Sequence, residues 1–193
     1  MAKQLFRNVE YTRTKVKNNI LKVWRETTEE QKHDWYLEAN DFCNELSERY
    51  CVSNSIVIGI LSALSPLKKW EQNKIITEQL LETKDAGHMR MLVNKALDIL
   101  ETKASDEEIL KILNGKKISS FYLNIKYPNK YNAVIDRHSL SVAIGRKISD
   151  EEYAMTKNQY DFFENCYEYA SKEIGVTPSI LQSATWLKWR ELN

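Results

Sequence analysis

The segment that decides the fold is LNGKKISSFYLNIKYPNKYNAVIDRHSLSVAIG, residues Leu113–Gly145. Asn114-Gly115 is suited to end a helix, since glycine readily takes the left-handed conformation that follows a helix C-terminus. A second helix is expected to begin with Lys117 and to stop at the turn Tyr127-Pro128-Asn129. The segment therefore predicts two helices joined by a very short connection.

An acidic residue, Asp136, follows the short apolar run Ala133–Ile135 and precedes a helix expected over 138–144. Residues 111–147 contain eight lysines or arginines, and Asp136 is their one acid. A lone carboxylate in a basic segment suggests a site that grips a polyanion and keeps one negative charge for chemistry.

The net charge of +1 hides alternating blocks. Residues 1–25 carry +6, residues 26–110 carry −8, residues 111–147 carry +7 and residues 148–193 carry −4. If the two basic blocks meet in space, they form a basic face. The alternative is that these charged residues only make the surfaces of the helices soluble. The second basic block, beside a glycine turn, favours a contact with nucleic acid.

Three cysteines, Cys43, Cys51 and Cys166, lack metal-ligand spacing, and we expect no metal and no cofactor. Their odd number, with no signal peptide upstream, indicates an intracellular, cytoplasmic setting. No apolar run is long enough to cross a membrane. Motifs of nucleotide hydrolysis, dinucleotide binding, zinc proteases and α/β-hydrolases do not occur.

Helical periodicity dominates the chain, and five glycines with three prolines leave little room for the turns of an all-β protein. We expect about ten helices and no sheet, an all-α fold. The expected helices span 9–24, 28–50, 54–64, 66–80, 89–100, 105–113, 117–125, 138–144 and 149–174. A last helix is opened by Thr177-Pro178 and carries Leu181, Trp186 and Trp189. Capping signals set several of these starts, at Thr27 or Thr28, at Ser53 or Asn54, at Ser105 and at Ser149.

The order helix, short hairpin, helix and then aspartate resembles the helix-hairpin-helix DNA glycosylase superfamily. The resemblance is carried by LNGKKI (113–118) and VIDRH (134–138). The motifs LSALSP, W-x-x-N, IDRH and a terminal LQ-x-x-x-W also resemble small phage and mobile-element proteins related to that superfamily. The resemblance implies two helical lobes around a cleft, residues 27–112 against residues 1–26 with 113–193.

By the same resemblance, Asp136 occupies the place of the family's catalytic aspartate, and Lys117 that of the lysine of its bifunctional members. An ungapped alignment puts Ser119 on that lysine instead, and Asn114 stands where the family has proline. From the residues themselves, Asp136 could equally be the N-cap of the next helix. Lys117 could equally contact phosphate or solvent.

A hairpin between two helices exposes backbone N–H groups that can clamp a phosphate, and the alternative is an ordinary helix–helix turn. The candidate DNA-binding residues are Asn114, Gly115, Lys116, Ser119 and Arg137. The candidate substrate-binding residues are Trp70, Asn73, Asn124, His138 and Gln182. Each of these could instead be structural, and Trp186 and Trp189 are assigned to the core.

The resemblance implies an enzyme that flips a modified base out of double-stranded DNA and hydrolyses its N-glycosidic bond. A hypermodified base of phage DNA is the suggested target, with strand cleavage by Lys117 as an added activity. The first alternative is a base-hypermodifying transferase on the same fold. The second is a non-catalytic DNA-binding or host-interaction protein. The sequence leaves the oligomeric state open.

Overall fold

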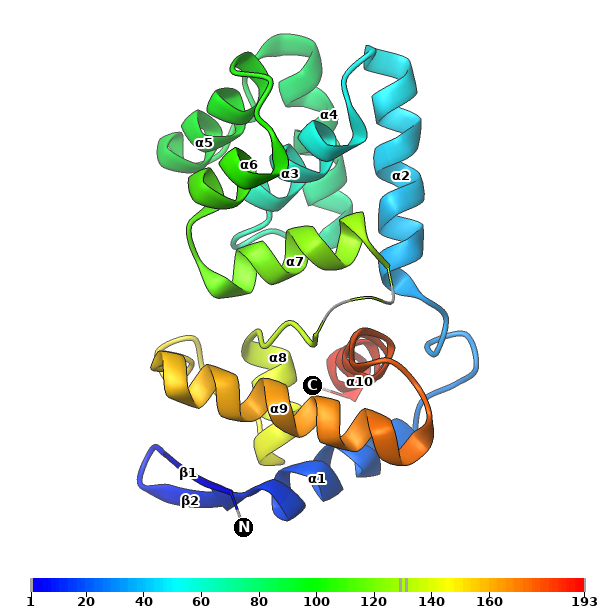
Figure 1. Ribbon diagram of the computed structural model, residues 1–193, viewed down its shortest axis with the longest axis vertical. Coiled ribbons are helices and arrows are strands. Elements are labelled where there is room, and N and C mark those ends of the chain that lie inside the picture. Colours follow the sequence, from blue (N-terminus) through cyan, green and yellow to red (C-terminus); the bar gives the residue numbers. More distant parts are fainter. Residues whose placement is uncertain (1, 129, 131, 193) are drawn as a thin grey trace. The chain divides into compact units, whose positions relative to one another are not determined.

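A computed structural model describes residues 2–128, 130 and 132–192. These residues form ten α-helices and one two-stranded sheet, which confirms the mainly α-helical class (Figure 1). The elements are β1 (Lys3–Phe6), β2 (Val9–Thr12), α1 (Arg13–Arg25), α2 (Trp35–Tyr50), α3 (Asn54–Leu64), α4 (Trp70–Thr83), α5 (Arg90–Glu101), α6 (Asp106–Leu113), α7 (Lys116–Lys126), α8 (Arg137–Ile144), α9 (Lys157–Ile174) and α10 (Pro178–Leu192).

The expectation of no sheet and of one helix over 9–24 is wrong, because residues 3–12 form a β-hairpin. Its two-residue turn, Arg7-Asn8, has φ values of 48° and 62°. Two left-handed residues match the twist of paired strands, and asparagine tolerates that conformation. Phe6 and Tyr11 lie buried on one side of the hairpin, each in edge contact with Phe163 of α9. The first helix therefore begins only at Arg13.

Two helices begin later than their capping signals predict. α2 begins at Trp35 instead of Thr28, and α9 begins at Lys157 instead of Ser149. The signals Thr28–Gln31 and Ser149–Glu152 do form their reciprocal side-chain to backbone hydrogen bonds, but each closes an isolated turn. A capping box satisfies local donors whether or not a helix follows it.

The start predicted for α4 at Pro66 is also wrong, since Leu67 has a φ of 62° and the helix begins at Trp70. The starts predicted at Ser53 and Ser105 are confirmed for α3 and α6. The turn predicted at 127–129 includes Asn129, which lies outside the described residues.

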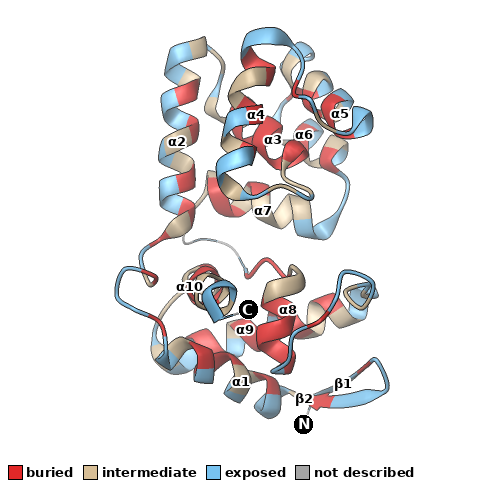
Figure 2. Ribbon diagram, turned by 180° about the vertical axis from the view of Figure 1, so that it is seen from behind, coloured by how far each residue is buried: buried red, intermediate tan, exposed pale blue. Residues whose placement is uncertain are grey.

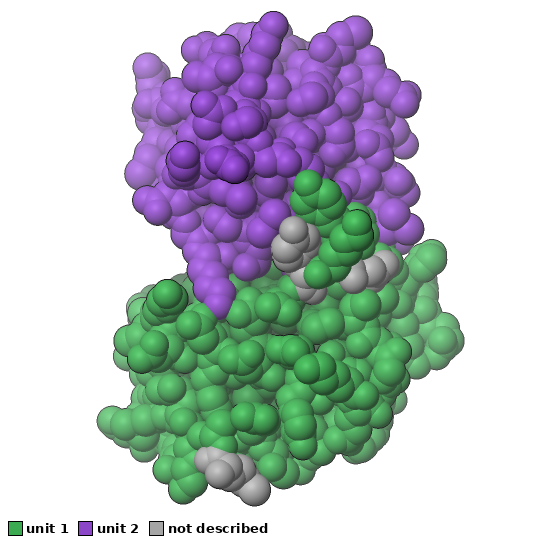
Figure 3. All heavy atoms as spheres, viewed as in Figure 1, with its two compact units in different colours: residues 1–36, 127–193 green, residues 37–126 purple. Residues whose placement is uncertain are grey.

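The chain divides into two compact units (Figure 3), described separately here. Unit 1 comprises residues 1–36 and 127–193 and contains the hairpin with α1, α8, α9 and α10. Its core gathers buried apolar side chains from all these elements, among them Ile20, Val142, Phe163 and Leu181. The short helix α8 lies in this core with most of its residues buried (Figure 2).

Unit 2, residues 37–126, is built around α3, whose residues Ile56–Leu64 are all buried. Gly59 permits the close packing of α5 and α6 on this helix. A Cβ atom at that position would lie 3.1 Å from both Ile99 and Ile109, tighter than ordinary contact. Even a methyl group at position 59 would therefore require Ile99 and Ile109 to shift by a few tenths of an ångström.

The predicted domain division, with 113–193 grouped beside 1–26, differs from the observed one. Residues 113–126 belong to unit 2, because Tyr122 and Ile125 of α7 are buried where this helix packs on α3. The glycosylase-like arrangement around a cleft stays a prediction. In the described chain, no helix combines the length and apolar character needed to cross a membrane.

Candidate functional site

The predicted site residues fall in both units. Unit 1 holds Asp136, Arg137, His138 and Gln182. Unit 2 holds Trp70, Asn73, Asn114, Gly115, Lys116, Lys117, Ser119 and Asn124. The expected convergence of Lys117 and Asp136 on one cleft accordingly stays a prediction.

The carboxylate of Asp136 is fixed by two N–H donors. As N-cap of α8, Asp136 accepts a hydrogen bond from the backbone N–H of Ser139 to Oδ1, at 2.7 Å. The indole N–H of Trp186 on α10 donates to Oδ2, at 2.8 Å. Asp136 as a whole residue is half-buried. The capping role proposed as an alternative is thus real, and a second helix holds the same group.

Ser139, on the first turn of α8, is held by a second residue of α10, which is held in turn by Tyr36. Gln182 of α10 donates from its amide to Oγ of Ser139, at 2.9 Å. The amide oxygen of Gln182 accepts from the hydroxyl of Tyr36, at 2.8 Å. Since both ends of the Gln182 amide are used inside the protein and the residue is buried, its geometry fits a structural role better than base recognition.

Tyrosine hydroxyls fix the segment that leads into Asp136. Tyr153 donates to the carbonyl of Ile135 at 2.7 Å, and Tyr160 accepts from the backbone N–H of Ile135 at 3.1 Å. Tyr167 donates to the carbonyl of Ser139 at 2.9 Å. Burial raises the pKa of Tyr153 and of Tyr167, and the nearby Asp136 charge acts in the same direction. Both hydroxyls therefore remain protonated donors at neutral pH.

Arg137 and His138 follow Asp136 on the first turn of α8. The guanidinium of Arg137 forms an ion pair with Asp150 at 2.8 Å, so much of its charge is neutralised within unit 1. His138 is half-buried with its ring edge against Trp186, the ring centroids lying 6.1 Å apart. Burial lowers the pKa of His138, while the charge of Asp136 opposes the shift. A neutral imidazole beside the carboxylate is the outcome near neutral pH.

Two residues of this site were not predicted from the sequence, Trp186 and Arg190. Trp186, assigned to the core, is only half-buried and lies 6.3 Å from Trp35, centroid to centroid. The exposed guanidinium of Arg190 stacks 4.4 Å from the ring centroid of Trp186. Gln182, Trp186 and Arg190 are spaced four residues apart, so one face of α10 carries all three. This spacing is the sequence signal from which their common position on α10 could have been predicted.

The predicted hairpin exists in unit 2. Asn114 and Gly115 alone connect α6 to α7, with φ values of 46° and 158°. Lys95 donates to the carbonyl of Leu113 at 3.1 Å and closes the end of α6. Lys116 and Lys117 open α7 and are both exposed. Ser119 is half-buried, its backbone N–H donating to the carbonyl of Gly115 at 2.9 Å.

The remaining candidates in unit 2 are mostly structural. Asn73 is buried and donates from its amide to the carbonyl of Leu61 at 3.1 Å, which ties α4 to the end of α3. Asn124 is fully buried on α7. Trp70 is half-buried with its ring against Phe42, and the ammonium of Lys74 lies 5.6 Å from its centroid. Of the three, Trp70 alone is not buried.

In the described part of the chain, no three His, Cys, Asp or Glu side chains lie close enough to hold a metal ion. The chemistry available at the site is thus that of a fixed carboxylate, a neutral imidazole, a stacked arginine and aromatic rings. We refer to Asp136, His138, Trp186 and Arg190 as the Asp136 cluster.

Comparison with known proteins yields one family and nothing further. No curated protein and no solved structure matches the chain. The model of a family of unknown function, DUF7178, matches residues 2–193, and the chain therefore belongs to that family.

Proposed function

We propose that this protein is a DNA glycosylase-like enzyme that binds an everted, modified base and hydrolyses its N-glycosidic bond. The observation that carries the proposal is the carboxylate of Asp136, held by the Ser139 and Trp186 N–H groups at 2.7 and 2.8 Å in a residue that is only half-buried. Cleavage of such a bond develops positive charge on the sugar, and a carboxylate fixed in advance stabilises it without reorganising.

The aromatic surroundings of Asp136 support the binding of a base. Trp35 and Trp186 are half-buried, so each keeps some accessible ring surface, and Arg190 lies stacked on the second ring. A base turned out of a duplex is held by stacking on such rings and by contacts to its edge. The half-buried His138 would supply an edge contact close to the carboxylate.

The hairpin of unit 2 would grip the DNA backbone. The first N–H groups of a helix have no partner within that helix, and they point toward an anion placed at its start. At the start of α7, Gly115 has no atom within 4 Å of its would-be Cβ position, so a backbone can approach there. The exposed Lys116 and Lys117 add positive charge at the same place.

A lyase role for Lys117 has less support than a phosphate contact. Attack on a sugar carbon requires a neutral amine, which burial or a neighbouring cation normally produces. Lys117 is adjacent to Lys116 but is exposed on the first turn of α7. Borohydride treatment of the protein with abasic DNA tests the point, since a Schiff base at Lys117 would be trapped covalently.

A non-catalytic DNA-binding role is the second candidate, and one observation favours it. Both oxygens of Asp136 already accept a hydrogen bond from the protein, as a purely structural N-cap would. Each carboxylate oxygen nevertheless has a second lone pair, which leaves room for a contact to substrate.

Product analysis on DNA separates the candidates. The wild-type protein is incubated with unmodified DNA and with phage DNA that contains hypermodified bases, and the products are examined for free base, abasic sites and changes in base mass. Release of free base supports the glycosylase. A mass gain in the presence of an added donor indicates a transferase, and tight binding without product indicates the non-catalytic role.

A further inference from the structure

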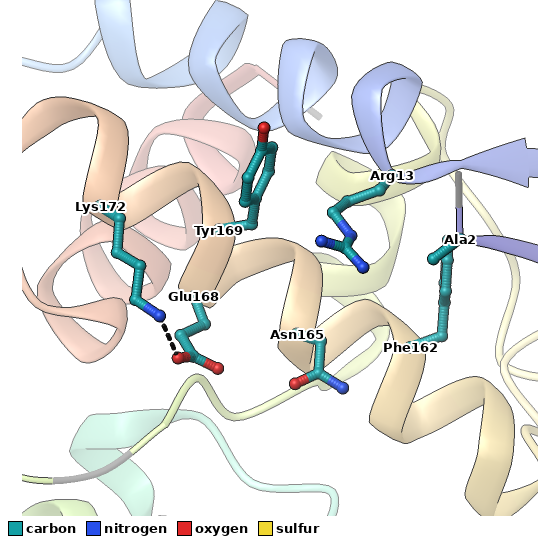
Figure 4. A pocket seen from close by; sticks show the side chains of 7 residues that line it. All are labelled: Ala2, Arg13, Phe162, Asn165, Glu168, Tyr169 and Lys172. Carbon is teal, nitrogen blue, oxygen red and sulfur yellow. Dashed lines mark hydrogen bonds and ion pairs between the residues drawn. The ribbon is translucent and has the colours of Figure 1, made fainter.

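Unit 1 contains a polar concavity between the start of α1 and the middle of α9. Its volume is about 330 Å³. The residues that line it are Ala2, Arg13, Phe162, Asn165, Glu168, Tyr169 and Lys172 (Figure 4). None of them belongs to the Asp136 cluster. We refer to it as the α1–α9 pocket.

Arg13 is the distinctive group of this pocket. It is the first residue of α1 and reaches toward Asn165 of α9, between Tyr169 and Ala2 (Figure 4). Its guanidinium lies 5.3 Å from the ring centroid of Tyr169. A guanidinium held against a ring is restricted in advance, so it loses less entropy when it binds a ligand.

The other cations near Tyr169 are already neutralised. Lys17 pairs with Glu173 at 2.5 Å, and Lys172 pairs with Glu168 at 2.6 Å. Arg13, in contrast, has no carboxylate partner and donates no side-chain hydrogen bond within residues 2–128, 130 and 132–192. Its planar set of donors is therefore available, and that set matches the oxygens of a phosphate.

Two neighbours add contacts of a different kind. Tyr169 is 44% exposed, although large aromatic residues usually lie buried. Arg13 and Lys17 lie 5.3 and 5.8 Å from its ring centroid, so a planar group would stack on the part of the ring that these two cations leave open. The amide of Asn165 is exposed on the pocket side of α9 and can donate or accept. Glu168 on the same wall is paired with Lys172, so this ion pair adds little net charge to the pocket.

We propose that the α1–α9 pocket binds one nucleotide, with Arg13 on its single phosphate and Tyr169 stacked on its base. The phosphate can belong to a free nucleoside monophosphate or to one link of a single-stranded nucleic acid, and the chemistry is the same. The proposal does not depend on catalysis at Asp136. It adds a second nucleic-acid contact to unit 1, at the basic N-terminal block of the chain.

Titrations of the whole protein by isothermal calorimetry, using inorganic phosphate, deoxyadenosine monophosphate and a short deoxyadenosine oligonucleotide, test the proposal. The nucleotide should bind saturably and more tightly than phosphate, because only the nucleotide uses Tyr169. Tighter binding of the oligonucleotide identifies a strand as the natural source, and equal binding identifies the free nucleotide. Absence of saturable binding by all three, or equal affinity for phosphate and nucleotide, overturns the proposal.

Variants locate the site. Arg13→Ala should weaken nucleotide binding by about tenfold or more, as expected for loss of charge-assisted hydrogen bonds. Arg13→Lys should lose most of the same affinity despite keeping the charge, and it covers the case in which Arg13→Ala fails to fold. Tyr169→Leu should weaken binding of the nucleotide by roughly tenfold, the order expected for one stacked base. Binding of phosphate should weaken less, because phosphate loses only the restriction that the ring places on Arg13.

The matched control is Arg25→Ala, which removes an equally exposed arginine from the last turn of the same helix. It should change the affinity by less than about twofold, since a distant surface charge is screened by salt. If Arg25→Ala bound the nucleotide as weakly as Arg13→Ala does, the loss of affinity would reflect unspecific electrostatic attraction. Full nucleotide affinity in Arg13→Lys would contradict the proposal that the guanidinium of Arg13 binds the phosphate.

Discussion

The hydrogen bond between Trp186 and Asp136 can be isolated by the substitution Trp186→Phe. Phenylalanine keeps an aromatic ring beside His138 and Arg190 but removes the indole N–H that lies 2.8 Å from Oδ2 of Asp136. Hydrogen bonds to charged groups contribute about 1.5–3 kcal/mol. Because both residues are half-buried and solvent can partly replace the donor, we expect the lost bond to cost about 1–2 kcal/mol.

Loss of ring volume also destabilises a Trp→Phe variant, so a matched control is needed. Trp24 of α1 is half-buried against the core of the same unit. Its indole N–H donates no hydrogen bond to any residue that the structure describes. Trp24→Phe should therefore show the packing cost alone, and the difference between the two variants estimates the hydrogen bond.

The free energy of unfolding is measured by urea titration, followed by circular dichroism because tryptophan fluorescence changes with the substitution. A cycle with Asp136→Asn and the double variant should give a coupling energy of about 1 kcal/mol. Equal destabilisation by Trp24→Phe and Trp186→Phe, together with a coupling energy near zero, would refute the proposed bond.

Three further outcomes are expected. Burial lowers the pKa of His138 below its ordinary 6.5, so the unfolded chain binds a proton at this residue at a higher pH than the native protein does. The contribution of His138 to the free energy of unfolding should therefore be complete above about pH 6.5 and should be lost as the pH drops below it. Urea titrations at pH 7.5 and pH 5 should show a smaller loss of stability in His138→Gln than in the wild-type protein. Thr77 is fully buried and its hydroxyl has no hydrogen-bond partner among the described residues, so Thr77→Val should raise the midpoint of thermal unfolding. The equally buried Thr185 donates to the carbonyl of Leu181 at 2.8 Å, so Thr185→Val should lower the midpoint by the equivalent of about 1 kcal/mol. A lower midpoint in both variants would contradict this interpretation. Lys116→Ala should weaken DNA binding about equally for all sequences and reduce the slope of log affinity against log salt by about 1, and an unchanged slope would remove Lys116 from the phosphate clamp.

The segment 113–145 was the most predictable part of the fold. The hairpin at Asn114-Gly115, the helix α7 and the helix that follows Asp136 all form as the sequence indicates. Each depends on local chemistry, namely a left-handed cap, a proline stop and an aspartate N-cap. The errors arose where the same local signals are used without a helix, as at Thr28 and Ser149.

The N-terminal hairpin was missed for a related reason. Residues 9–12 read equally well as the start of a basic amphipathic helix, and their strand state is decided by burial of Phe6 and Tyr11 against α9. That contact joins segments more than 150 residues apart, which a local pattern cannot reveal.

Part of the candidate site was accessible from the sequence as well. Asp136 stood out as the one acid of a basic segment, and His138 follows it in the chain. The partners that fix Asp136, Trp186 above all, come from α10, fifty residues away. A tryptophan is most often core, so its half-buried position and its use of the indole N–H emerged only from the packing of α8 against α10.

The central claim is that the carboxylate of Asp136 stabilises charge during cleavage of a base from its sugar. Asp136→Asn is nearly isosteric and can still accept from the Ser139 N–H at the start of α8, so the fold should survive. On DNA that the wild-type protein cleaves, single-turnover release of free base should be slower by about 10²–10³-fold in this variant, while Asp161→Asn on α9 should be unchanged. Base release at the wild-type rate by correctly folded Asp136→Asn would contradict the claim.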